Sequence, residues 1–479
     1  MQTTTCPRLQ RDLPGLHDLA DARRLRAAGV GANAKHLSGE LTNKVNLMPA
    51  PRKLWRLDPS VLLPLLAALT QGAWAQAGGA PQEVSWSERP ALFDSPDGPH
   101  QWLRDRGVAL GLSWTQYGQT LTSPSSGENS VQWDGKLYAK VGLDFTKMGL
   151  WDGFSANAIY EYRNKTEGGV YGFNGTLLPV NTQVYHPAGG ESNAFAMTFT
   201  QRFGKDLSLT AGKFNMIDAA AGAPIIGGGD VFTTFWNLNF AAPPSGIVPA
   251  YITGFSGSYN TPGANFTLMV YDPRDSQDVS GLDGWSEDGI NTRLAVRFPV
   301  KAGGNDGFHT LVGVYSTQDK IDLADLPHIT LPPGTPSTPV DTKGSSWYLG
   351  WNFQQYLWQN PGNPGQGWGV FGQLFVTDGN PNLYRWGGNL GIAGNSPIAG
   401  RSLDRFGIGI FNTSFSEDLT GSLKTITGYT IDDERGVELF YNFAVTPWFR
   451  VMANLQYIRP GVQTFDNGFF AGMSAQIRF

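Results

Sequence analysis

From residue 108 to the C-terminus, segments of about ten residues alternate apolar and polar positions. A period of two is that of a β-strand whose two faces meet different surroundings. Short polar turns and longer loops rich in Gly, Pro, Asp and Asn separate these segments in turn. The pattern predicts strands at 108–121, 131–144, 153–165, 191–203, 207–215, 248–260, 264–272, 290–300, 308–317, 345–357, 368–377, 402–413, 419–429, 435–444, 449–458 and 467–479, of which 419–429 has the weakest alternation.

The segment that ends the chain, 467–479, shows two different faces. One parity carries small or apolar side chains, namely Ala471, Met473, Ala475, Ile477 and Phe479. The other carries polar or small ones, namely Gly472, Ser474, Gln476 and Arg478. This ending is typical of the closing strand of a Gram-negative outer-membrane barrel, whose wall meets lipid outside and water inside. A soluble sheet edge can show the same alternation, so the other segments must decide.

Charged side chains of the other segments keep to one parity, which we interpret as inward. This inward set includes Lys136, Tyr138, Glu161, Arg163, Arg293, Arg297 and Glu438. A Lys or Arg that faces lipid at the bilayer midplane costs about 2 to 4 kcal/mol, so this confinement is informative. Lys213, which shares the parity of Leu207 and Leu209, needs a bulge or a position at the rim. We therefore predict an all-β protein, a transmembrane antiparallel β-barrel of about 16 strands, a size that leaves a water-filled channel.

The composition changes this picture at the N-terminus. The longest apolar run, Val61 to Leu69, is shorter than the roughly 20 residues of a spanning helix and contains Pro64. With the basic residues just before it and Ala73-Trp74-Ala75 after it, it predicts a signal peptide at 48–75, cleaved there or at Ala75-Gln76-Ala77. Residues 1–47 are then either the product of a start codon placed too far upstream or a cytoplasmic extension.

The exported part is acidic and lacks cysteine. Residues 1–75 hold 10 of the 35 basic and 5 of the 40 acidic residues, which leaves 25 basic and 35 acidic residues, a net charge of −10. This balance argues against nucleic acid as a partner. The single Cys, Cys6, lies before the cleavage site, so no disulfide is expected in the exported part. The His residues show no metal-cluster spacing, and no metal or cofactor is predicted.

The connection Met216 to Val248, after the fifth predicted strand, is too apolar and aromatic for a solvated external loop. In sixteen-stranded porins the connection after strand five folds into the barrel and narrows it. We expect this loop to do the same, with Asp230, Phe235 and Trp236 as candidate constriction residues. The alternative is an apolar loop that caps the rim.

Several stretches resemble the carbohydrate-selective porin family, the OprB-like outer-membrane porins. They are Leu103-Arg104-Asp105-Arg106-Gly107-Val108, Gly212-Lys213-Phe214-Asn215, Glu438-Leu439-Phe440-Tyr441, Thr446-Pro447-Trp448, Leu455-Gln456-Tyr457-Ile458-Arg459-Pro460-Gly461 and the terminal Phe479. The chain departs from the family pattern before Leu103 and at Ala453-Asn454. The resemblance implies passive, saturable diffusion of glucose-type sugars or small oligosaccharides, selected at a constriction of charged and aromatic side chains.

The candidate lining residues combine the inward charges with the loop. They are Lys136, Tyr138, Glu161, Arg163, Arg202, Asp230, Phe235, Trp236, Arg293, Arg297 and Glu438. Charged and amide groups can bond sugar hydroxyls, and aromatic rings can stack on sugar C–H faces. For each residue the alternative is an ordinary solvated lumen side chain.

Other segments and partners complete the prediction. Residues 76–107 form an N-terminal periplasmic segment, in which 99–106 is expected to be a short amphipathic helix, either a cap at the barrel base or a frayed arm. Carbohydrate solutes, outer-membrane lipid and, through Phe479, the barrel-assembly machinery are the expected partners. The barrel is expected as a monomer or a homotrimer.

Other functions compete with this one. An enzyme needs a nucleophile, base and acid in one site, and only His309 among the exported His residues falls in a predicted strand, where we place it inward. A general, non-selective diffusion porin differs only in a wider constriction without saturation.

Overall fold

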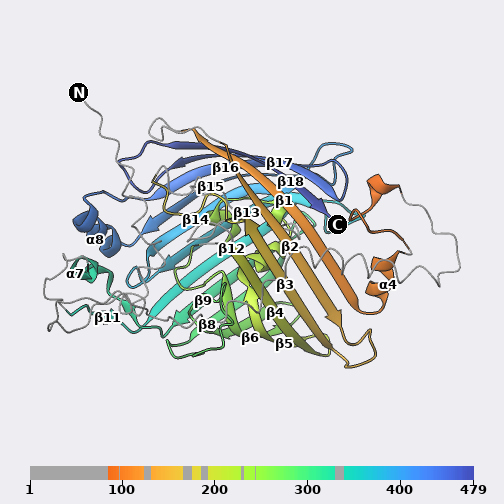
Figure 1. The fold of residues 1–479 in the computed structure, drawn as a ribbon, viewed down its shortest axis with the longest axis horizontal. Coiled ribbons are helices and arrows are strands. Elements are labelled where there is room, and N and C mark those ends of the chain that lie inside the picture. The colour runs from red at the N-terminus through yellow and green to blue at the C-terminus, as the bar shows by residue number, and fades with distance from the viewer. Residues whose placement is uncertain are drawn as a thin grey trace, which may run out of the picture.

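The computed structural model describes residues 85–96, 98–122, 131–164, 175–184, 192–227, 231–242, 244–329 and 339–479. The predicted upstream segment 1–47, the signal peptide 48–75 and Asp230 lie outside these residues. The described part is dominated by long antiparallel strands arranged around a single barrel (Figure 1).

Sixteen strands of the described ranges close into this barrel, and each pairs with its neighbours in antiparallel register. They are β1 (Val108–Thr122), β2 (Gln132–Asp144), β3 (Phe154–Asn164), β4 (Ser192–Phe203), β5 (Leu207–Asn215), β6 (Tyr251–Asn260), β7 (Asn265–Tyr271), β8 (Asn291–Ala302), β9 (Asn305–Ser316), β12 (Ser346–Gln359), β13 (Gly367–Thr377), β14 (Tyr384–Asn395), β15 (Arg405–Phe415), β16 (Glu434–Ala444), β17 (Phe449–Arg459) and β18 (Gly468–Arg478). The last strand pairs with the first, from Ser113↔Arg478 to Thr122↔Phe469, and closes the barrel.

The predicted strand count is confirmed, but two of its elements were wrong. Residues predicted as a strand at 419–429 belong to helix α8 (Glu417–Thr427), and β14 was missed. Leu419, Leu423 and Ile426 recur at helical spacing, and the Ser416 side chain accepts a hydrogen bond from the Leu419 N–H as an N-cap. The signal for β14 is weak because glycine and small residues fill its inner parity, so the sequence shows little alternation.

The two ends of the barrel differ in the length of their connections. Short turns at 204–206, 261–264, 303–304 and 445–448 lie at one end, together with both ends of the described chain. Long connections lie at the other, which also carries α7 (Leu326–Ile329), α8 and the small β10 (Lys320–Ile321) and β11 (Thr342–Lys343) pair (Figure 1). In outer-membrane barrels the short turns are periplasmic, so the long loops are extracellular.

At the periplasmic end, the N-terminal segment packs against the strand that finishes the barrel. The Leu92 N–H donates to the Arg478 carbonyl at 2.8 Å, and the rings of Phe93 and Phe479 stack at 6.0 Å. Helix α4 (Pro99–Asp105) lies beside β1, where the sequence predicts a helix, and Arg104 pairs with Asp94 at 3.0 Å. The segment is therefore attached to the barrel edge.

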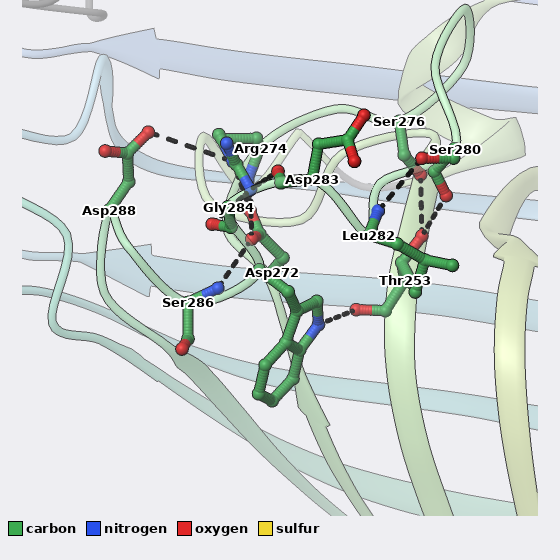
Figure 2. Close-up of polar contacts among 11 residues, drawn as sticks. Thr253, Asp272, Arg274, Ser276, Ser280, Leu282, Asp283, Gly284, Ser286 and Asp288 are labelled. Carbon is green, nitrogen blue, oxygen red and sulfur yellow. Dashed lines mark hydrogen bonds and ion pairs between the residues drawn. The ribbon is translucent and has the colours of Figure 1, made fainter.

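The connection between β7 and β8 explains the position of Lys213. The Lys213 ammonium donates to the carbonyls of Gln277 and Val279, at 3.2 and 2.7 Å, near the extracellular end of β5. Thr253, which pairs with Lys213 across strands, bonds the Ser276 hydroxyl and the Ser280 carbonyl of the same connection (Figure 2). A charge on the outward parity is thus solvated by backbone carbonyls at the rim.

An ion-pair network holds this connection in shape. Arg274 forms two hydrogen bonds to Asp272, at 2.8 and 2.7 Å, and lies 3.8 Å from Asp288 (Figure 2). Burial disfavours the Asp272 carboxylate, but the hydrogen bonds from the Arg274 guanidinium and from the N–H groups of Arg274 and Ser286 outweigh it and lower the Asp272 pKa. The connection, residues 272–290, is therefore an ordered segment beside β5 and β6, which we call the strap.

Candidate functional site

The connection between β5 and β6 lies inside the barrel, as predicted from its apolar character. It contains α5 (Met216–Ala221), the 3₁₀ turn η2 (Val231–Thr233) and α6 (Leu238–Ala241). Phe235 stacks on Phe240 and meets Phe371 of β13 and Phe440 of β16 edge-on, and Trp236 meets Tyr117 of β1. The loop is therefore packed on the inner faces of β1 and β13 to β18.

Glycines on the inner faces make room for these rings. A Cβ added at Gly472 of β18 would collide with the Trp236 ring, and one at Gly407 of β15 would collide with Phe440 and Phe235. Bare backbone at these positions lets the aromatic side chains lie flat against the wall. Glycines of the strands therefore lie where the aromatic rings of the loop pack against the barrel wall.

Glu438 anchors the loop to the wall. Its carboxylate accepts hydrogen bonds from the N–H groups of Trp236 and Asn237, at 2.6 and 3.0 Å, and from the Asn454 amide. Gln456, on the neighbouring strand, accepts from the Asn237 amide at 3.1 Å. Glu438 is 0% exposed, so it holds the loop and has no surface for a solute.

A second inward segment, 175–184, covers the extracellular part of the same wall. Glu434 accepts from the Leu177 N–H at 2.7 Å, and the Gln456 amide donates to the Val180 carbonyl at 2.8 Å. Val180 and Val184 pack in the same cluster as Phe235 and Trp236. Glu434 was not among the predicted site residues, although its inward parity with Glu438 could have indicated it.

A buried ionic cluster joins β2 and β3 to the two ends of the loop. Glu161 of β3 pairs with Lys136 at 3.0 Å and with Arg163, and it accepts a hydrogen bond from the Tyr251 hydroxyl at 2.8 Å. Asn215, which precedes the loop, also donates to Glu161 at 3.3 Å. Lys136, Glu161 and Arg163 are at most 3% exposed, so their charges compensate one another out of reach of the passage.

Tyr138 of β2 contacts Asp218 of α5 at the edge of the inward loop. The Tyr138 hydroxyl donates to the Asp218 carboxylate at 2.5 Å, and its ring meets Phe232 edge-on. Burial and the nearby Glu161 charge raise the Asp218 pKa, an effect that the hydrogen bond from Tyr138 opposes. Asp218 was missed by the sequence analysis, which looked for constriction residues nearer the middle of the loop.

We interpret the accessible inner surface of the strands that the loop leaves uncovered as the passage. Inner side chains of β1 and β15 to β17 are almost all buried, whereas β4 to β7 keep half-exposed inner side chains in their periplasmic halves. The half-exposed inner positions carry hydroxyls at Thr198, Thr200, Thr210, Ser256, Ser258 and Thr267. Thr200 and Thr210 are hydrogen-bonded at 2.9 Å, and Ser258 and Thr267 at 3.2 Å. This hydroxyl surface was not predicted from the sequence, because serine and threonine carry neither a charge nor an aromatic ring.

Two arginines of β8 border the same passage. Arg297 is exposed, lies over the Phe308 ring at 4.3 Å and donates to the Thr310 hydroxyl at 3.3 Å. Arg293 is half-buried near the phenol groups of Tyr271 and Tyr348. Two residues above Arg293, Asn291 donates to the Ile247 carbonyl of the inward loop at 2.7 Å. Arg293 therefore lies directly below the point where the loop meets β8.

The structure thus divides the predicted lining residues. Tyr138, Arg293 and Arg297 border the passage. Phe235, Trp236 and Glu438 are buried between loop and wall, and Lys136, Glu161 and Arg163 form a buried junction, so none of these six reaches a solute. Arg202 is exposed at the periplasmic end of β4, where its N–H bonds the Gly153 carbonyl, and is far along the strand from the loop. Strand parity predicts the side of the wall that a residue faces, but it does not predict what covers that side.

The inward placement of His309 was wrong. His309 pairs with Phe353 on the outward parity, and its ring stacks on Trp351 and Phe353 at 5.7 and 5.9 Å.

In the described ranges no group of three or more His, Cys, Asp or Glu residues is arranged to hold a metal ion. The helices within those ranges are too short or too polar to cross a membrane.

Comparison with known proteins identifies the family. The model of the carbohydrate-selective porin, OprB family matches residues 128–479. Porin B of Pseudomonas aeruginosa is 29% identical over 165 residues, which cover 31% of this chain and 36% of that protein. Putative porin QuiX of Acinetobacter baylyi is 27% identical over 240 residues, which cover 44% of this chain and 52% of that protein. The chain thus spans about a third to a half of the length of these curated relatives.

A solved structure supports the fold. The high-pH structure of Pseudomonas putida OprB matches with a TM-score of 0.70 at 19% identity, and the match covers 83% of this chain and 100% of that chain. At this identity the likeness concerns the fold alone. Because the family model spans well over half of the sequence, the chain belongs to the carbohydrate-selective porin, OprB family.

Proposed function

We propose that this protein lets small carbohydrates diffuse passively across the Gram-negative outer membrane. The observation that carries the proposal is a barrel whose inward loop fills one inner side and leaves hydroxyls, Tyr138 and arginines accessible on the other. Hydroxyl and guanidinium groups form weak hydrogen bonds with sugar hydroxyls, so a sugar can enter and leave without being trapped. Glucose-type monosaccharides and small oligosaccharides are the proposed solutes.

The proposal includes the route by which the chain reaches the membrane. Residues 48–75 act as a signal peptide, 1–47 are an upstream extension and 76–107 are a periplasmic segment before the barrel domain, 108–479. The Phe479 N–H donates to the Leu112 carbonyl at 2.9 Å. The barrel-assembly machinery recognises the C-terminal strand that leads to Phe479. The outer faces, with residues such as Leu209, Leu268 and Leu294, contact outer-membrane lipid.

Uptake into proteoliposomes tests the proposal. The refolded mature protein is reconstituted, and the rate of glucose entry is measured against glucose concentration, with an oligosaccharide of four or more units as a size control. The proposal predicts a rate that saturates with glucose and falls steeply for the larger sugar. A rate that rises linearly for every solute below one size would instead identify a general diffusion porin.

A further inference from the structure

Several carboxylates on the inner face of the barrel are withdrawn from the passage. Glu161, Glu434 and Glu438 are at most 1% exposed, and their oxygens accept hydrogen bonds from backbone N–H groups, amides or cationic side chains. Asp134 is also fully buried and accepts from Gln119 at 3.0 Å. Asp218 stays half-buried under its bond from Tyr138. These acidic groups therefore contribute little negative charge to the surface that a solute meets, whereas Asp144 and Asp306 stay accessible near the periplasmic ends of β2 and β9.

Arg293 and Arg297 are arranged differently. Neither forms an ion pair with a carboxylate of the described residues, although both lie on the inner parity of β8. Arg297 is held by the Phe308 ring beneath it and by Thr310, contacts that fix the guanidinium without neutralising its charge. Its Nη groups remain available for a bidentate bond to a carboxylate.

Their spacing gives two successive contacts along the passage. Four residues of extended strand separate them, about 13 Å along β8. The row of Arg297 continues across the sheet through Thr310 to Asn352, and that of Arg293 through Val314 to Tyr348. The half-exposed Asn352 can therefore hydrogen-bond the sugar ring of a solute held by Arg297, whereas Val314 and Tyr348 beside Arg293 are buried.

We propose that these two arginines form a two-step site for the carboxylate of sugar acids, so that the passage favours uronates and aldonates over neutral sugars. The inference rests on the proposed function and adds the class of solute. The first step lies below the contact between the loop and β8, and the second lies nearer the periplasm. A single guanidinium at each step keeps binding weak enough for the solute to move on.

Planar-bilayer recordings of the refolded mature protein test this site in two ways. The reversal potential in a KCl gradient reports ion preference, and titration with glucuronate and with glucose reports block of the current. We expect a reversal potential that indicates anion selectivity. Glucuronate should reach half-maximal block at a concentration about tenfold below that of glucose. R293Q/R297Q should abolish both differences, and it should weaken glucuronate block much more than glucose block.

Two further variants keep the test decisive. R202Q removes the same charge at the periplasmic end and should leave the glucuronate preference intact. R297K keeps the charge but loses the bidentate geometry, so it should retain the ion preference and weaken glucuronate block. Glucose block without any anion preference in the unmodified protein would overturn the two-step site and leave the porin intact. Absence of block by either sugar would overturn the proposed function itself.

Discussion

At the scale of single residues, charged groups of this barrel serve two different purposes. Glu438 and Glu161 are hidden and hold the inward loop, whereas Arg297 is open to the passage. Inward parity was predicted correctly for all three from the alternation of their strands. Their roles were not predictable, because cover by a loop far away in sequence decides which of them a solute can reach.

Glu438→Ala should loosen the inward loop. It leaves the N–H groups of Trp236 and Asn237 without their acceptor, and each unpaired buried donor costs about 1 to 3 kcal/mol. We expect a larger and noisier single-channel conductance. Glu417→Ala, on the exposed face of α8, is the control and should leave the conductance unchanged. An unchanged trace for both variants would contradict the anchoring role.

Lys136→Met should destabilise the barrel, because it removes one partner of the buried Glu161 cluster. Loss of one partner of a buried ion pair costs about 3 to 5 kcal/mol, and Arg163 should compensate part of this. The measurement is urea unfolding in lipid vesicles. Lys140 lies four residues further along β2, on the same inner face, but is exposed. Lys140→Met should therefore change the free energy of unfolding little. Equal effects of both variants would argue against the junction.

The raised pKa of Asp218 predicts a pH effect on ion preference. As the pH falls through this pKa, Asp218 loses its negative charge earlier than an ordinary aspartate, and the groups facing it are Tyr138, Lys136, Lys140 and Glu161. The folded state holds this proton more tightly than the unfolded chain, so the associated stability is present at low pH and is lost as the pH rises.

Reversal potentials measured at decreasing pH check this effect. The reversal potential should shift in the direction of anion selectivity as Asp218 is protonated. Asp218→Asn should remove this shift. Asp152→Asn, in the turn between β2 and β3, should keep it. A pH response that survives in Asp218→Asn would assign the titration to another group.

At the scale of elements, the long connections carry most of what distinguishes this barrel. The apolar composition of 216–248 was sufficient to predict a loop inside the barrel, and helical spacing of Leu419, Leu423 and Ile426 was sufficient to predict α8 but was not recognised. The strap between β7 and β8 could not be predicted, because its fixed shape depends on Lys213 and Thr253 of other strands.

Arg274→Ala should open this strap. Asp272 then loses two hydrogen bonds from the guanidinium, and the carbonyls of Asp283 and Gly284 lose theirs. Limited proteolysis of the protein in vesicles should cut within 272–290 at least several times faster. Arg385→Ala, which breaks an exposed ion pair with Glu417, should not change cleavage there. Cleavage at the original rate in Arg274→Ala would show that the strap is held by its other contacts.

At the scale of the whole molecule, the barrel is lopsided. The inward loop and the segment 175–184 fill the side formed by β1 and β13 to β18, and the passage follows the hydroxyls and arginines of the other side. An even strand count and a lipid-facing parity were enough to predict the barrel. The lopsided filling comes from aromatic packing between Phe235, Trp236 and the glycines of the wall, which no local pattern shows.

We expect a sugar to occupy this passage as it crosses the membrane. The most direct measurement is the single-channel conductance of the refolded mature protein as glucose is titrated on one side of the bilayer. The ion current should fall with glucose and reach a plateau, as expected when one solute at a time fills a site. A current that changes only with the viscosity of the solution would contradict it.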